Sequence, residues 1–290
     1  MKRIMRRYFV FLFTAVVMLV SCHKEEGNHM DEPVSGGDSE AGGIPAYVSQ
    51  EYPSTAQVIY KAVTDVDGNC YDAVMIGDQV WMAQNLRTTR YADSTEIGLG
   101  VEHTFTEPCR YPPGYSQNYE QNEKNVAYYG YLYNWPAVMH ISGTEDNPGS
   151  TANPSGVQGV CPDGWHVPSQ VEWDQMREYM NTQPLYLVNG IEHTFAKALS
   201  ANWAWEGCNV SGTPGNDRNA NNATGFSALP AGERVYSIGD FGYAAYFWSA
   251  TGDYRYDGLA HMQKLYTDRE IVYVSDSYKY DAYSVRCVRD

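Results

Sequence analysis

The apolar positions near the start of the chain form one continuous run, whereas apolar positions elsewhere are scattered or alternate with polar ones. Residues 8–20 are apolar except for one threonine, and four of the first seven residues are basic. The run is too short to span a bilayer and ends just before Ser21 and Cys22. This pattern predicts a signal peptide over residues 1–21, with a buried helix or an uncleaved anchor as the alternative.

A second pattern, short apolar runs broken by turn residues, occupies residues 63–83. The runs at residues 71–76 and 80–83 are separated by Gly77 and Asp78, and the sequence Asp-Gly-Asn at residues 67–69 precedes them. Alternating runs joined by such turns are typical of adjacent antiparallel strands. We therefore expect a β-meander here.

Helical patterns are few and short. Asn134 and Pro136 occupy the N-cap and first-turn positions of a short helix. Ser169 and Glu172 form a capping-box pattern, and the apolar residues at 173, 176 and 180 share one face of the helix that follows. Glu172 is therefore interpreted as a helix cap rather than as a catalytic acid. A third, weaker helix is expected near residues 195–201.

Composition divides the rest of the chain. Residues 22–43 are rich in Glu, Asp, Gly and Ser and predict a flexible tether, because they cannot bury enough apolar surface to fold. Residues 44–62 form an N-terminal extension, and residues 63–290 suit one large β-rich domain. Loss of residues 1–21 leaves 16 basic and 35 acidic residues, a net charge of −19. This charge excludes nucleic-acid binding and leaves a lipid anchor as the expected membrane contact.

The sequence at residues 19–22 resembles the lipobox of bacterial lipoproteins, which implies that Cys22 carries a lipid. Residues 23–26 resemble the surface-export signal of some Gram-negative lipoproteins. The expected location is the cell outer membrane, with the domain facing the exterior. Five other cysteines remain, and a compartment outside the cytoplasm permits disulfides. Cys70 with Cys109 is one weak candidate pair; the alternative is that all five stay reduced and buried.

Tyrosine is concentrated in the C-terminal third, where it is interleaved with Asp, Ser and Gly. This mixture is typical of binding surfaces, because a stiff amphipathic ring gives contact area and a hydrogen bond at low entropic cost. The alternative is that tyrosine suits half-exposed strands. The candidate ligand-binding residues are Tyr243, Tyr246, Trp248, Tyr254, Tyr256, Asp257, Tyr266, Tyr273, Asp276, Tyr278 and Tyr280.

Six ordered blocks together resemble the Fibrobacter succinogenes major paralogous domain, and they span residues 63–290. The body plan of this family resembles the C-type-lectin-like fold of formylglycine-generating enzymes. The resemblance implies an α+β protein with twisted antiparallel sheets, two or three short helices and long loops. It also implies that the chain ends meet, which pairs Cys161 with Cys287. The blocks are residues 63–69, 76–86, 129–135, 161–168, 225–230 and 284–289.

The position of the tyrosines before the last strand resembles the variable region of retroelement-diversified proteins built on lectin-like scaffolds. The tripeptides of calcium-dependent lectin sites do not occur, and the nearest oxygen-rich stretch contains Asn216, Asp217 and Asn219. These residues are weak calcium candidates, because Arg218 opposes a cation and a solvated loop is the simpler interpretation. No other cofactor is expected.

An enzyme is the rival class. No nucleophile elbow, zinc-protease helix or phosphate-binding glycine loop occurs in the sequence. His166 could be mistaken for a general base, but packing beside the capped helix is the better interpretation. The sequence thus favours a binding or adhesion module for an extracellular glycan or surface protein. A structural or pilus-associated component is the alternative, and a carbohydrate-active enzyme is less favoured.

Overall fold

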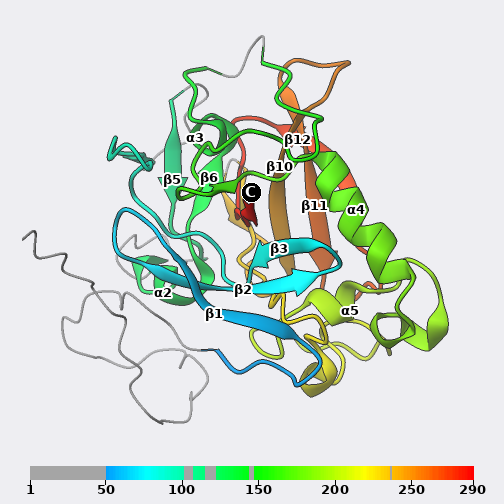
Figure 1. Cartoon of the computed structure of the whole chain (residues 1–290). Coiled ribbons are helices and arrows are strands. Elements are labelled where there is room, and N and C mark those ends of the chain that lie inside the picture. Colours follow the sequence, from blue (N-terminus) through cyan, green and yellow to red (C-terminus); the bar gives the residue numbers. More distant parts are fainter. Residues whose placement is uncertain (1–49, 101–106, 115–121, 144–146, 236) are drawn as a thin grey trace, which may run out of the picture.

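An antiparallel meander of three strands forms the N-terminal part of the folded chain (Figure 1). The computed structural model describes residues 50–100, 107–114, 122–143, 147–235 and 237–290. The meander comprises β1 (Gln57–Thr64), β2 (Cys70–Ile76) and β3 (Gln79–Met82). Gly68 and Gly77 make the two turns with positive φ, as a tight reversal requires. The predicted meander is confirmed.

Strand β1 begins before the expected domain start at residue 63. Its first residues pair with β2, so residues 57–62 are part of the sheet. The predicted signal peptide, Cys22, the tether and residues 44–49 lie outside the described residues.

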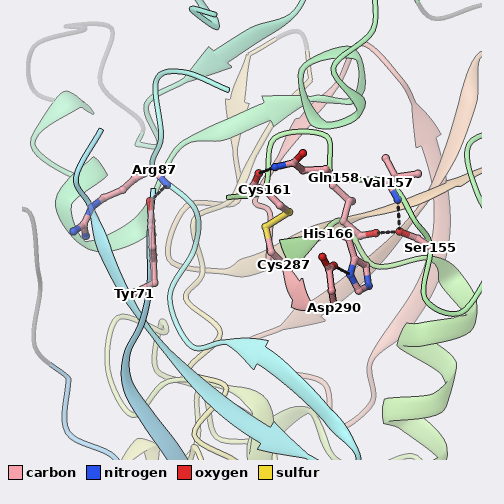
Figure 2. Close-up of a disulfide and its surroundings, with 10 residues drawn as sticks. Tyr71, Arg87, Ser155, Val157, Gln158, Cys161, His166, Cys287 and Asp290 are labelled. Atoms are coloured by element: carbon pink, nitrogen blue, oxygen red, sulfur yellow. Dashed lines mark hydrogen bonds and ion pairs between the residues drawn. A yellow bond between two sulfur atoms is a disulfide. The ribbon is translucent and has the colours of Figure 1, made fainter. Parts of the chain in front are cut away.

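The end of the chain returns to this meander. Strand β14 (Val288–Arg289) pairs with β3 on one side and with β7 (Trp165–His166) on the other. Beside these strands, Cys161 and Cys287 form a disulfide with Cα atoms 6.0 Å apart (Figure 2). The pairing implied by the resemblance is confirmed. The weaker pairing of Cys70 with Cys109 is wrong, because Cys109 is a buried thiol.

Two further sheets complete the β structure. A six-stranded sheet has the order β4-β5-β6-β13-β8-β9, and a three-stranded antiparallel sheet has the order β10-β11-β12. Their strands are β4 (Gly98–Leu99), β5 (Cys109–Tyr111), β6 (Leu132–Asn134), β8 (Glu233–Arg234), β9 (Ile238–Gly239), β10 (Ala244–Gly252), β11 (Leu259–Tyr266), β12 (Tyr273–Tyr278) and β13 (Ala282–Tyr283).

The helices are short, and the three that the sequence predicts are present, whereas α2 was not predicted. Asn134 caps α3 by accepting a hydrogen bond from the Ala137 N–H, and both halves of the capping box of Ser169 and Glu172 are present at α4. The apolar face of α4 is buried, as expected. The helices are α2 (Val126–Tyr129), α3 (Trp135–Met139), α4 (Gln170–Asn181) and α5 (Ala196–Leu199), with 3₁₀ turns η1 (Pro184–Tyr186), η2 (Val188–Gly190) and η3 (Arg218–Ala220). The α+β class is confirmed.

A fully buried cation ties distant segments together at the centre of the molecule. The Arg286 guanidinium donates to the Asn85 side chain and to the carbonyls of Met82 and Ser227. It also lies 4.6 Å from the centre of the Phe226 ring. Burial lowers the pKa of Arg286 to about 9. The last strands are thereby fixed against both the meander and the loop at residues 226–227.

Within the described parts of the chain, no helix has both the length and the apolar character needed to cross a membrane.

Candidate binding site

Most of the predicted binding residues lie on the three-stranded sheet or on the loop between β10 and β11. Tyr246, Lys264 and Tyr273 lie opposite one another in register and therefore share one face of the sheet. Helix α4 packs beside the other face, where the Arg177 guanidinium donates to the Gln263 side chain (Figure 1). One face of the sheet is therefore covered by α4, and the opposite face is directed towards β13.

Two of the predicted binding residues, Tyr246 and Trp248, belong to the core and cannot contact a ligand at the surface. The Trp248 indole N–H donates to the carbonyl of Tyr133 at 2.8 Å, and the Tyr246 hydroxyl donates to the carboxylate of Asp240. Every residue of β10 is buried, because other elements pack on both of its faces. These two assignments are corrected.

Three other predicted residues, Tyr243, Tyr266 and Tyr273, form a half-buried row. The centre of the Tyr266 ring lies 5.8 Å from the centre of each of the other two rings. The Tyr243 hydroxyl donates to Asp268 at 3.0 Å. Because these rings pack mainly on one another, they leave little ring area for a ligand, and we assign them a supporting role.

Most of the remaining predicted residues form a group that we call the aromatic tip: Tyr254, Tyr256, Asp257 and Tyr278, which are exposed, together with the half-buried Tyr280. Tyr254 is 87 % exposed, Tyr256 63 % and Tyr278 53 %. The rings of Tyr278 and Tyr280 stack at 4.9 Å between centres with planes 7° apart. Single exposed aromatic side chains are common, but several grouped together are characteristic of binding surfaces.

The loop that carries Tyr254 and Tyr256 is held by a buried carboxylate. Asp253 accepts hydrogen bonds from the Arg255 backbone N–H at 2.7 Å and from its guanidinium at 2.9 and 3.1 Å. The adjacent Arg255 holds the pKa of Asp253 far below its usual range. The Asp253 N–H donates to the carbonyl of Leu259, which closes the loop. Tyr254 and Tyr256 are therefore presented by a fixed backbone.

A buried lysine fastens the same loop to the body of the protein. The Lys279 ammonium donates to the carbonyls of Asn147 and Asp257 and lies 4.6 Å from the centre of the Trp135 ring. Its backbone N–H donates to the carbonyl of Gly258. Burial lowers the pKa of Lys279. The two halves of the aromatic tip, on the loop and after β12, are joined through this residue.

Asp276 supports the tip from below. Its carboxylate accepts a hydrogen bond from Arg255 at 3.2 Å and contacts Nδ1 of His261 on the neighbouring strand. Its oxygens are thus engaged by two side chains of this protein, and we assign it a positioning role.

The oxygen-rich loop proposed for calcium already holds a cation of the protein itself. The Lys197 ammonium donates to the carbonyls of Asn216 and Asp217 and to the side chain of Asn221. The Lys197 ammonium thus occupies the backbone oxygens of Asn216 and Asp217, which opposes a second cation beside them, whereas the assignment of Asn219 stays a prediction. Across the described residues, no three His, Cys, Asp or Glu side chains gather to hold a metal ion.

His166 has a structural environment, as expected. Its Nδ1 atom lies 2.7 Å from a carboxylate oxygen of Asp290 (Figure 2). Its Nε2 atom lies 2.6 Å from a carboxylate oxygen of Glu172. Burial opposes the charged imidazolium, but these two hydrogen bonds outweigh burial and raise the pKa of His166. With both ring nitrogens engaged, His166 joins the start of α4 to the end of the chain.

Sequence reasoning missed the residues that hold the tip in place. Asp253 and Arg255, two positions apart after a strand, give a turn signal that could have been recognised. Lys279 gave no signal, because a lysine between tyrosines is normally read as exposed.

Family comparison gives one match. Residues 74–289 match the model of the Fibrobacter succinogenes major domain. Two further comparisons, with curated proteins and with solved structures, find no match. The matched region contains the disulfide, the three-stranded sheet and the aromatic tip. The chain therefore belongs to the Fibrobacter succinogenes major domain family.

Proposed function

We propose that this protein is a binding or adhesion module that recognises an extracellular glycan or surface protein through the aromatic tip. The observation that carries the proposal is the joint exposure of Tyr254 and Tyr256, on a loop fixed by Asp253 and Lys279, and of Tyr278 at the end of β12. A rigid platform loses little conformational entropy when it binds, so its contact area is converted efficiently into affinity.

The chemistry of the tip suits both proposed partner classes. Tyrosine rings stack on sugar rings, and the exposed carboxylate of Asp257 can accept hydrogen bonds from hydroxyl groups. The same rings provide the anchors that protein interfaces favour. No catalytic step is part of the proposal.

The proposal places the domain outside the cell. A lipid on Cys22 anchors it to the outer membrane, and the acidic tether at residues 22–43 separates the tip from the lipid surface. In this proposal the scaffold is C-type-lectin-like, and the tip residues are positions that a retroelement diversifies. The exposure of Tyr254, Tyr256 and Tyr278 supports this diversification, because replacing exposed side chains leaves the packing of the core unchanged.

The test is an array of glycans, mucins and envelope proteins, probed with the chain from residue 23 onward, with calcium or with chelator. We expect at least one reproducible ligand, bound equally in both conditions. Joint replacement of Tyr254, Tyr256 and Tyr278 by alanine should weaken binding at least about tenfold, because aromatic anchors dominate interface energy.

Tyr60→Ala is the matched control, because Tyr60 is as exposed as Tyr256, at 63 %, but lies on β1. Retained binding in this variant, with binding lost in the triple variant and an unchanged circular dichroism spectrum, supports the proposal. Binding that survives the triple replacement contradicts it.

A further inference from the structure

Strand β12 is an open edge. It pairs with β11 over six consecutive residues, and no other strand of the described chain pairs with its opposite side. The exposed side of such a strand offers backbone N–H and C=O groups to another strand. Val274 and Tyr278 add large side chains that are 43 % and 53 % exposed.

This edge lacks the usual protection against strand addition. Native edge strands are commonly interrupted by a bulge or proline, or carry lysine. The register of β12 against β11 is unbroken, and residues 273–278 contain neither proline nor lysine. Its charged residue, Asp276, already pairs with the Arg255 guanidinium and contacts the His261 ring. The strand can therefore approach another chain without presenting an uncompensated charge.

We propose that β12 pairs with β12 of a second copy of this chain, antiparallel and about a twofold axis at Ser275. Twofold pairing of a strand with itself must place one residue opposite its own copy. Ser275 at that position puts Val274 opposite Asp276 of the other copy and Tyr273 opposite Ser277, so no like charges meet. A twofold axis at Asp276 instead places two carboxylates face to face, which is unfavourable. A twofold axis at Val274 aligns fewer residues of the strand.

The dimer joins the two three-stranded sheets into one sheet of six strands and is isologous, so each copy contributes the same surface. It does not depend on the proposed function, because no ligand takes part in the pairing. The chain carries a net charge of −15, so the two copies repel each other at long range. Higher salt should therefore strengthen the dimer, since screening reduces this repulsion.

A cysteine at the twofold axis tests the register directly. Opposed residues in an antiparallel pair have Cα atoms about 4.5–5.5 Å apart, a spacing that a disulfide can span. We expect the chain from residue 23 onward, with Cys208→Ser and Ser275→Cys, to form a covalent dimer on mild oxidation. Val274→Cys in the same background is the control. Val274 is 43 % exposed, so random collisions between chains would crosslink a cysteine there at least as readily. In the proposed dimer the two copies of residue 274 do not lie opposite each other, so we expect this variant to crosslink less.

The second measurement is the mass of the unmodified chain by light scattering and sedimentation across a concentration series. We expect a monomer–dimer equilibrium, and Val274→Lys should weaken it at least about tenfold because an edge lysine opposes strand addition. Val210→Lys, at a valine that is 48 % exposed elsewhere on the surface, should leave it unchanged. A monomer at every concentration overturns the proposal, as does crosslinking through Val274→Cys that equals or exceeds crosslinking through Ser275→Cys.

Discussion

At the residue scale, three cationic side chains, two buried and one half-buried, hold loops by binding backbone carbonyls. Arg286, Lys197 and Lys279 each donate to carbonyl oxygens of segments distant in sequence. Burial lowers the pKa of all three side chains. Each nevertheless donates hydrogen bonds to loop carbonyls that would be left unsatisfied if the side chain were removed. Long irregular loops in this protein are thus organised by the protein's own side chains.

A half-buried acid on β8, Glu233, gives a pH-dependent prediction. Burial, reinforced by the charge of Asp240, raises the pKa of Glu233 from 4.5 to about 7. The folded state therefore favours the protonated form, and Glu233 lowers stability progressively as pH rises from about 4.5 through about 7. We expect Glu233→Gln to be more stable than the unmodified protein at pH 8, with the difference shrinking towards pH 4.5.

The measurement is urea unfolding of both proteins across this pH range. The pKa of His166 is also raised in the folded state, so its contribution to the free energy of unfolding falls as pH rises. Because both proteins contain His166, this contribution cancels in the difference between them. A difference between the two proteins that does not change with pH contradicts the assignment to Glu233.

At the element scale, local signals predicted the meander, the capped helices and the turns, because each depends on residues within a few positions of one another. The burial of Tyr246 and Trp248 could not be predicted in the same way. Strand β10 is covered on both faces, so its sequence lacks the alternation that would separate an inner face from an outer one. The residues of the aromatic tip were recognised from the local mixture of tyrosine with Asp, Ser and Gly. The contact that fixes them, from Lys279 to the carbonyl of Asn147, joins residues 132 positions apart and leaves no local pattern.

The capping box of α4 provides the prediction for this scale. The Ser169 side chain accepts from the Glu172 N–H and donates to the carbonyl of Ala152. We expect Ser169→Ala to lower the free energy of unfolding by about 1–2 kcal/mol, measured by urea unfolding. Glu178→Ala, an exposed position on the same helix, is the control and should change stability by less than about 0.5 kcal/mol. Equal effects of the two changes would show that the cap contributes little.

At the scale of the whole molecule, the fold is closed by bringing its two ends together. Strand β14 lies between β3 and β7, and Arg286 binds the meander from the adjacent position in the chain. This arrangement was implied by family resemblance rather than derived from the residues, because pairing between distant segments leaves no local pattern in a single sequence. It places the aromatic tip and the open edge of β12 on the same sheet. In a β12-paired dimer, the antiparallel register would place the two tips at opposite ends of the joined sheet, so one assembly would carry two binding sites and gain avidity for a ligand that reaches both.

The disulfide between Cys161 and Cys287 gives the prediction for this scale, because it crosslinks residues 126 positions apart. Closing so long a loop restricts the unfolded chain and should contribute about 4–5 kcal/mol in the chain-entropy model. We expect the double replacement Cys161→Ala and Cys287→Ala to lower the melting temperature by about 10–15 °C, with Cys208→Ser nearly neutral. Alanine is chosen because both cysteines are fully buried and a serine would add an unsatisfied hydroxyl group. A fall of only one or two degrees would contradict the prediction and would mean that the disulfide restricts the unfolded chain much less than the chain-entropy model requires. A fall of the expected size with native-like circular dichroism would assign the disulfide to stability and leave the architecture to the strands.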